Sequence, residues 1–234
     1  MGSAIIGLFA LMLSVSLFGC AHVGTVKSEL DDPNFQSQNL PSRALSVCVV
    51  SENSWPKEDI ETMIGRVSGL MAEQTGIQLQ VTNWIEHPLP SFTQKEGLQS
   101  LVKIISKEHK EYDLVIGFSS RGIASQLMEV PFGAWLGAID DNYRKFIIIK
   151  FLDERVLLHE ICHAFVFAKS HSTSGVMNAL LIKVPMLPFL FNIPKYLSKE
   201  DRQEILLNKW RDFNQKPSIP EEHQVDTIEL SANF

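Results

Sequence analysis

Two rhythms of hydrophobic residues alternate along the chain between residues 44 and 118. Short apolar runs rich in β-branched residues are typical of buried strands, whereas apolar residues that recur every three or four positions are typical of amphipathic helices. The predicted strands are 44–51, 77–85 and 112–118. The predicted helices are 56–76 and 95–109. Strands that alternate with helices in this way predict a sheet whose neighbouring strands are largely parallel.

The pattern changes after residue 130. Two apolar runs, 134–139 and 146–150, are separated by polar, turn-forming residues, which predicts an antiparallel hairpin. A helix is predicted next over 152–168, because no Pro or Gly interrupts it and Asp153 and Glu154 suit the positive end of its dipole. The predicted fold class is α/β (α+β): a mixed, mostly parallel twisted sheet with an antiparallel strand, packed by helices.

The start of the chain has the pattern of an export signal. Residues 4–18 form an apolar run that is too short to span a membrane, which takes about 20 residues, but that fits a secretory signal. The run ends at Leu17-Phe18-Gly19-Cys20, which resembles a bacterial lipoprotein signal whose cysteine is lipidated. An ordinary cleaved signal and an uncleaved anchor are the alternatives, and each of them exports the domain. The resemblance implies a lipid-anchored protein of the cell membrane or outer membrane that faces the periplasm or the exterior.

The rest of the chain divides by composition. Residues 21–43 are polar and without a period, which predicts a flexible tether after a signal over 1–20. A folded domain is expected over 44–216, and the polar residues 217–234 form a tail. Hydrophobic residues make up 45% of the chain, the net charge is −6 and no basic stripe is visible, so nucleic acid is not an expected partner. The oligomeric state stays open, with a monomer as the simplest expectation.

Two cysteines, Cys48 and Cys162, lie inside the expected domain. Their neighbours are apolar, which favours two small buried thiols, although an oxidising compartment would also permit a disulfide between them.

The predicted helix over 152–168 contains His159-Glu160-Ile161-Cys162-His163. Residues four apart lie on the same face of a helix, so the two histidines can bind one zinc ion, each at about 2.0–2.1 Å. Glu160 leans toward the same face and can reach a water molecule there, which suits a general base. This pattern predicts a zinc-dependent peptidase. A catalytic zinc needs a third protein ligand, and His171, just beyond the helix, is the best candidate.

The segment from His159 to Met177 resembles the metzincin clan of zinc peptidases, and within it the matrixins. The resemblance rests on the histidine pair, a third histidine shortly after, and a turn that ends in Met177. It implies zinc bound by three histidines, Met177 as a hydrophobic floor beneath the metal, and an edge strand over 133–139 that binds the substrate backbone. It extends loosely over residues 44–213.

The sequence departs from the clan pattern in this segment. Val166 occupies the position of the clan's glycine, and Lys169 occupies the usual third-ligand position, so His171 comes two residues late. We therefore expect a helix that runs further before it turns. The rival third ligand, as in gluzincins, is Glu200 or Glu204 on a helix expected to begin near Ser198.

The apolar stretch 179–193 is expected to form core and the wall of a substrate pocket, which implies a preference for a bulky apolar residue just after the scissile bond. The expected function is that of a zinc endopeptidase acting on proteins or peptides. The alternative is a domain that binds zinc or protein without turnover. Glu160 speaks against that alternative, because a structural zinc site needs no base.

Overall fold

The computed structural model describes seven stretches of the 234-residue chain. These are residues 40–52, 55–89, 93–119, 136–150, 152–167, 174–178 and 195–219. The chain divides into two compact units, and all described residues belong to Glu29–Leu181 with Ile193–Phe234. The expected signal over 1–20 and the apolar stretch 179–193 lie outside the described residues, as do most of the expected tether and tail. Within the described stretches, no helix has the length and apolarity needed to cross a membrane.

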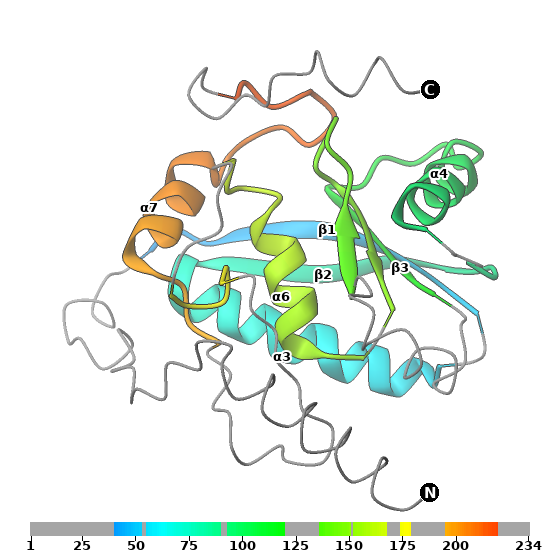
Figure 1. Cartoon of the computed structure of the whole chain (residues 1–234), viewed down its shortest axis with the longest axis horizontal. Coiled ribbons are helices and arrows are strands. Elements are labelled where there is room, and N and C mark those ends of the chain that lie inside the picture. The colour runs from blue at the N-terminus through cyan, green and yellow to red at the C-terminus, as the bar shows by residue number, and fades with distance from the viewer. Residues whose placement is uncertain are drawn as a thin grey trace, which may run out of the picture. The chain divides into compact units, whose positions relative to one another are not determined.

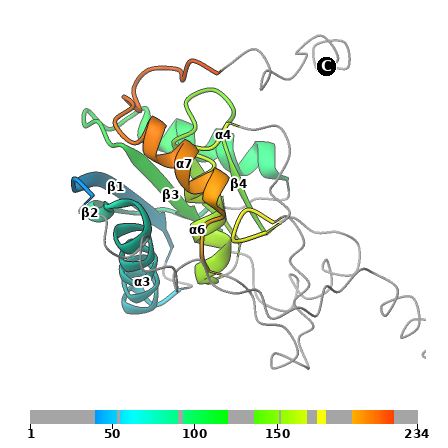
Figure 2. The ribbon, with the colours of Figure 1, turned by 90° about the vertical axis from the view of Figure 1, so that its left-hand side faces the viewer.

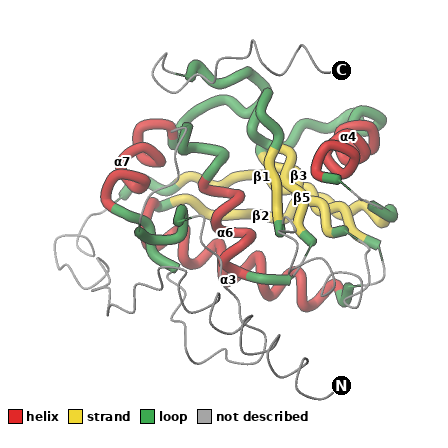
Figure 3. The backbone as a smooth tube through the Cα atoms, in the orientation of Figure 1, coloured by secondary structure: helices red, strands yellow, loops and turns green. Residues whose placement is uncertain are grey.

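The described residues form a five-stranded sheet in the order β2-β1-β3-β5-β4 (Figure 3). The strands are β1 (Arg43–Ser51), β2 (Ile77–Glu86), β3 (Leu114–Phe118), β4 (Gly137–Ile139) and β5 (Phe146–Ile149). All neighbouring pairs are parallel except β4 with β5, which are antiparallel and adjacent in sequence. The mostly parallel sheet with an antiparallel strand at its edge is thereby confirmed, and so is the hairpin.

Helices cover both faces of this sheet (Figures 1 and 2). The helices are α3 (Lys57–Thr75), α4 (Gln94–Ile105), α6 (Glu154–Cys162) and α7 (Lys199–Asn208). The larger core joins α3, α6 and α7 to one face, and the smaller core joins α4 to the other. Each buried aliphatic side chain contributes about 1.5–3 kcal/mol, so the larger core holds most of the stability.

Local sequence explains where most helices begin and end. Thr93 and Glu96 form a reciprocal capping box at the start of α4. Gly76 ends α3 in the left-handed conformation, with φ of 73°, which other residues rarely adopt. Ser198 caps α7, as the sequence predicted, by accepting a hydrogen bond from the N–H of Asp201.

Two helices are shorter than the sequence predicted. The helix expected over 95–109 ends at Ile105. The helix expected over 152–168 ends at Cys162, so the prediction of a longer helix in this family pattern is wrong. Its cause lies in side chains from distant parts of the chain, described below. Cys48 and Cys162 are both buried and unbonded, which confirms two buried thiols.

Candidate metal centre

Helix α6 carries His159 and Glu160, has His163 as its C-cap residue and is fixed at its first turn. Asp153 is its N-cap, and the Asp153 Oδ1 atom accepts hydrogen bonds from the N–H groups of Arg155 (2.9 Å) and Val156 (3.2 Å). Every residue from Arg155 to Cys162 is buried. The helix therefore has no solvent face over this stretch, and its polar side chains must find partners inside the protein.

The two histidines converge on one point. The Nε2 atoms of His159 and His163 are 3.1 Å apart, and their rings meet edge to face at 85°. Two nitrogens bound to one tetrahedral zinc at 2.0–2.1 Å would be about 3.3 Å apart. The spacing of the two Nε2 atoms therefore fits a shared metal ion with little movement.

A backbone carbonyl determines which ring nitrogen of His159 carries the proton. The Nδ1 atom of His159 lies 2.9 Å from the Val176 carbonyl oxygen, which can only accept, so Nδ1 carries the proton and donates. The lone pair of His159 is then on Nε2, the atom that faces His163. A ring N–H held by a backbone carbonyl is the usual outer contact of a metal-binding histidine, since it fixes the ring and raises its basicity.

The carbonyl of Val176 is itself held in place. The N–H of Val176 donates to the Tyr196 carbonyl oxygen at 2.8 Å. Gly175 has φ of 71°, and a Cβ atom there would lie 2.8 Å from the Ser198 nitrogen. Only glycine fits at that position, because both the backbone conformation and the space exclude a side chain. Met177 directly follows Val176 and is buried in the larger core.

Glu160 lies between the histidine pair in sequence and packs against the edge strand. It is 7% exposed, and burial raises its pKa to about 8. A Cβ atom on Gly137 of β4 would lie 2.8 Å from both Cγ and Oε1 of Glu160. Gly137 therefore makes the room that the carboxylate occupies. A cation bound beside the carboxylate would favour its ionised form.

Within the described residues, the two histidines have no third protein ligand. His171 falls outside the described residues. Among the residues that are described, no three His, Cys, Asp or Glu side chains group so that they could hold a metal. Both rivals are described: Glu200 is exposed, and Glu204 Oε1 accepts a hydrogen bond from the Phe167 N–H at 2.6 Å. Neither joins the histidine pair, so the gluzincin alternative has no support in this structure.

The chain after α6 is bound by side chains from the hairpin. Arg144, in the turn between β4 and β5, donates through Nη1 to the carbonyl oxygens of His163 (3.0 Å) and Val166 (2.7 Å). It adopts a left-handed backbone conformation with φ of 50°. Carbonyls at the end of a helix have no partners within the helix, and a cation there is also favoured by the helix dipole.

Side chains at and after α7 bind the remaining groups of the same turn. Arg211 Nη1 donates to the Ala164 carbonyl oxygen at 2.5 Å, and Asn208 Nδ2 donates to that of Phe165 at 2.7 Å. With the contact of Glu204, side chains bind all four carbonyls from 163 to 166 and the N–H of Phe167. We call Arg144, Glu204, Asn208 and Arg211 the exit clamp. It ends α6 without the glycine of the clan pattern.

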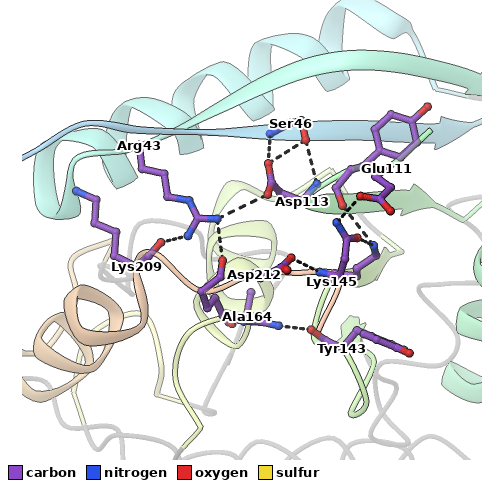
Figure 4. A network of polar contacts seen from close by, with 12 residues as sticks. Arg43, Ser46, Glu111, Asp113, Tyr143, Lys145, Ala164, Lys209 and Asp212 are labelled. Carbon is purple, nitrogen blue, oxygen red and sulfur yellow. Dashed lines mark hydrogen bonds and ion pairs between the residues drawn. The ribbon is translucent and has the colours of Figure 1, made fainter. Parts of the chain in front are cut away.

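The segment that carries Arg211 is tied to the sheet (Figure 4). Arg43, at the start of β1, donates to the carbonyl oxygens of Lys209 and Arg211 and lies 3.6 Å from the Asp113 carboxylate. Lys145, next to Arg144, donates to Asn214 Oδ1 at 2.7 Å. The exit clamp is thus held from the first strand and from the hairpin at once.

Arg155 is a further buried cation on α6. It is 3% exposed, and only its Nη2 atom has a partner, the Asn178 carbonyl oxygen at 2.8 Å. Its Nε and Nη1 atoms are buried without a hydrogen-bond partner in the structure as described. Burial lowers the pKa of Arg155, and the charge of Asp153 acts in the opposite direction.

Sequence reasoning missed Gly137, Arg144 and Arg155. Gly137 gave a signal, because a glycine inside a predicted strand often marks the close approach of another group. An arginine in a turn or in the first turn of a helix is usually solvated, so Arg144 and Arg155 gave none.

Comparison with known proteins gives structural likeness only. No protein-family model matches the chain, and no curated protein is similar to it in sequence. Archaemetzincin from Methanopyrus kandleri aligns at 15% identity and a TM-score of 0.47 over 72% of this chain and 97% of that one. A zinc-dependent peptidase from Methanocorpusculum labreanum (strain Z) aligns at 11% identity and 0.42, over 68% of this chain and 99% of that one.

A third solved structure, a chaperone–substrate complex, aligns at 17% identity and a TM-score of 0.48 over 71% of this chain and 34% of that one. None of these TM-scores reaches 0.5, so none of the likenesses bears on what this chain does. The metal centre has to be judged by the geometry of its own residues.

Proposed function

We propose that the protein is a zinc-dependent endopeptidase in which His159, His163 and His171 bind the metal and Glu160 is the general base. The observation that carries the proposal is the 3.1 Å approach of the Nε2 atoms of His159 and His163, with His159 Nδ1 held by a backbone carbonyl. Two Nε2 atoms that meet at one point, with one ring oriented by a backbone carbonyl, are the arrangement that two imidazoles sharing a zinc ion require.

Each residue has a defined task in the proposed reaction. Zinc, when bound, supplies a Lewis acid that polarises the substrate carbonyl and lowers the pKa of a water molecule to about 7. Glu160 accepts the proton of the attacking water and passes it to the leaving amine. Gly137 leaves the space in which the Glu160 carboxylate stands against β4. The buried surroundings of Glu160 keep bulk water away from the transferred proton.

The edge strand supplies a place for the substrate. β4 is the outermost strand of the described sheet and is antiparallel to its neighbour. An extended peptide can add to such an edge through backbone hydrogen bonds, without regard to its side chains. Because Gly137 on this strand contacts Glu160, a peptide bound along β4 would pass close to the proposed base.

The proposed protein is exported and anchored by lipid on Cys20, facing the periplasm or the exterior, as a monomer whose partners are its substrates and the membrane. A Cys20→Ala variant should lose the lipid mass and move from the membrane to the soluble fraction. Retention of that variant in the membrane would instead indicate an uncleaved apolar anchor.

Zinc content and peptide cleavage test the function together, on the full chain in detergent. We expect one zinc per chain in the native protein and in Glu160→Gln, with cleavage by the native protein only. His171→Ala should lose tight zinc binding, whereas Glu200→Ala should keep it as the matched control. Zinc without cleavage by the native protein would favour a binding domain, and no zinc would refute the proposal.

A further inference from the structure

Arg155 is a buried charged group of α6 that the proposed mechanism leaves unused. It is 3% exposed, yet only one of its nitrogens has a hydrogen-bond partner. A guanidinium carries five N–H donors and keeps its charge at any working pH. A buried charge with unused donors costs free energy that a pairing anion would recover.

The position of Arg155 relates it to the metal centre. Arg155, His159 and His163 are four residues apart in turn, so they share one face of α6. Arg155 donates to the Asn178 carbonyl and His159 donates to the Val176 carbonyl. These two carbonyls belong to residues two positions apart on one segment. One helical turn is about 5.4 Å, and one extended residue spans about 3.3–3.6 Å. A group one or two residues from the scissile bond is therefore within reach of Arg155.

The chain that follows the histidine pair offers no carboxylate to pair with Arg155 until Glu200. Between Glu160 and Glu200 the chain contains no Asp or Glu, although these make up 27 of its 234 residues. The same stretch contains four lysines: Lys169, Lys183, Lys195 and Lys199. The sequence between Glu160 and Glu200 is thus locally basic in a chain whose net charge is −6.

The two acids next to Arg155 in sequence have other tasks. Asp153 caps α6 through the N–H groups of Arg155 and Val156. Glu154 accepts hydrogen bonds from Arg66 at 2.7 Å and from Lys195. No ion pair joins Arg155 to a carboxylate within the described residues.

We propose that Arg155 binds a carboxylate of the substrate within two residues of the scissile bond, either an acidic side chain or a free C-terminal carboxylate. The inference rests on the proposed peptidase function and adds a substrate class to it. Arginine is suited to this task, because two of its remaining N–H groups can pair with both oxygens of one carboxylate. The selected substrates are acidic peptides, in place of the apolar preference that the 179–193 stretch predicts.

Matched peptides test this selectivity on the native full chain in detergent, with added zinc. The peptides share one sequence and carry Glu, Gln or Leu at each of the two positions on either side of the scissile bond. A second pair ends in a free carboxylate or an amide two residues after that bond. We expect kcat/KM to be at least about tenfold higher for Glu than for Gln at one position, or for the acid than for the amide, which is about 1.4 kcal/mol.

The two arms separate the two sources of the carboxylate. A Glu effect identifies a side chain, and a terminal effect identifies the end of the peptide. Preference for Leu, or Glu and Gln cleaved within about threefold of each other in every peptide with no terminal effect, overturns the proposal.

Variants show whether Arg155 is the residue responsible. Arg155→Met keeps the length of the side chain and removes the charge, so the ratio of kcat/KM for the Glu peptide to that for the Gln peptide should fall from about tenfold or more to within about threefold. Arg66→Met is the matched control, because Arg66 is an exposed arginine of α3 that contacts the neighbouring Glu154, and it should keep the preference. An equal loss on both peptides in Arg155→Met overturns the role of Arg155. If that variant does not fold, Arg155→Lys should reduce the ratio of Glu to Gln rates.

A binding measurement separates failure of this inference from failure of the peptidase function. Fluorescence anisotropy of the Glu160→Gln full chain, with and without zinc, compares labelled Glu and Gln peptides. We expect a Kd about tenfold lower for the carboxylate peptide, about 1.4 kcal/mol. If the native protein cleaves both peptides equally well and Glu160→Gln binds them equally well, the role of Arg155 is refuted and the peptidase function is kept. A protein that cleaves nothing but discriminates in binding refutes the peptidase and keeps the carboxylate site.

Discussion

The buried arginines at the two ends of α6 differ in how many of their N–H groups bind other parts of the protein. At the C-terminal end, Arg144 and Arg211 donate to backbone carbonyls of the turn that follows the helix. At the N-terminal end, Arg155 is more deeply buried but uses only Nη2. The first end is completed by the protein itself, because every carbonyl of the turn has a partner. Among the described residues, Arg144 and Arg211 each leave one buried donor, Nε, without a partner, whereas Arg155 leaves both Nε and Nη1. The larger number of unused donors lies at Arg155, four residues before the proposed metal ligand His159, and a binding site needs such donors before its ligand arrives.

The contrast teaches that charge and burial alone do not distinguish structure from function. Sequence patterns gave no reason to expect either arginine in its place. Arg144 binds the carbonyl of Val166, which stands at the position of the clan's glycine, and Arg155 is a buried cation on a helix. What separates them is the number of donors that the protein satisfies internally.

Arg144→Met should have the largest effect and tests the completed end. It leaves two carbonyls without their donor, at His163 and Val166, so the free energy of unfolding should fall by about 2–4 kcal/mol. Zinc affinity should fall about 10–100-fold, because His163 loses the contact that holds its backbone. Thermal melts with and without zinc, together with a chelator competition, measure both effects. Zinc affinity equal to that of the native protein would show that the clamp has no bearing on the metal centre.

Gly137→Ala should change turnover more than binding. Its Cβ atom would lie 2.8 Å from Cγ and Oε1 of Glu160 and 3.0 Å from Val156, so the carboxylate must move. We expect kcat to fall about 10–100-fold with zinc content unchanged, since a displaced base loses its alignment. Steady-state kinetics with metal analysis decide this, and Gly69→Ala on α3, where a Cβ meets nothing within 4 Å, is the control. Unchanged kcat in Gly137→Ala would exclude Glu160 as the base in this position.

Two variants of Glu204, a residue of the exit clamp, form a matched pair. Glu204→Gln keeps an oxygen that can accept from the Phe167 N–H, so its stability should stay within about 0.5 kcal/mol of native. Glu204→Ala leaves that N–H without its partner and should cost about 1–2 kcal/mol. Denaturant unfolding of the two variants compares them directly. If Gln and Ala destabilise equally, the charge of Glu204 matters and the hydrogen bond does not.

Arg155→Met should change stability less than Arg144→Met. It removes a buried charge with unused donors, so the free energy of unfolding should change by less than about 1 kcal/mol, or rise. The unfolding experiment used for Arg144→Met also measures the free energy of unfolding of Arg155→Met, so the two ends of α6 can be compared directly. A loss as large as that of Arg144→Met would mean that Arg155 is a structural residue and that the two ends do not differ.

A smaller effect concerns pH at the N-terminal end. Hydrogen bonds from Arg66 and Lys195 lower the pKa of Glu154 below its usual value of 4.5. A lowered folded-state pKa stabilises the protein above the unfolded value, and this contribution is lost as the pH falls through the folded value. Native protein should exceed Glu154→Gln in stability by less than about 1 kcal/mol at pH 7, and the difference should shrink below about pH 4.5. A difference that grows on acidification would contradict the assignment.

The sequence predicted those parts of the fold that depend on local patterns. Strand periodicity and the polar turn placed the hairpin of β4 and β5, and Ser198 marked the start of α7. The spacing of His159 and His163 placed both on one face of α6, because a helix fixes that geometry whatever surrounds it.

The end of α6 could not be predicted from local sequence. No Pro or Gly ends the helix, and the groups that do come from Arg144, Glu204, Asn208 and Arg211, up to 47 positions away along the chain. The contact between Gly137 and Glu160 joins a strand to a helix in the same non-local way. The unused donors of Arg155 are visible only once its neighbours are placed, because an arginine in a first helical turn gives no sign of burial.

The most direct test of the metal centre is X-ray absorption spectroscopy at the zinc edge of the full-length native protein. The proposed site predicts one zinc per chain, with three imidazole nitrogens at about 2.0–2.1 Å and one oxygen ligand. A protein that retains no zinc, or zinc whose nearest neighbours include sulfur or fewer than two imidazoles, would contradict a catalytic centre built on His159 and His163.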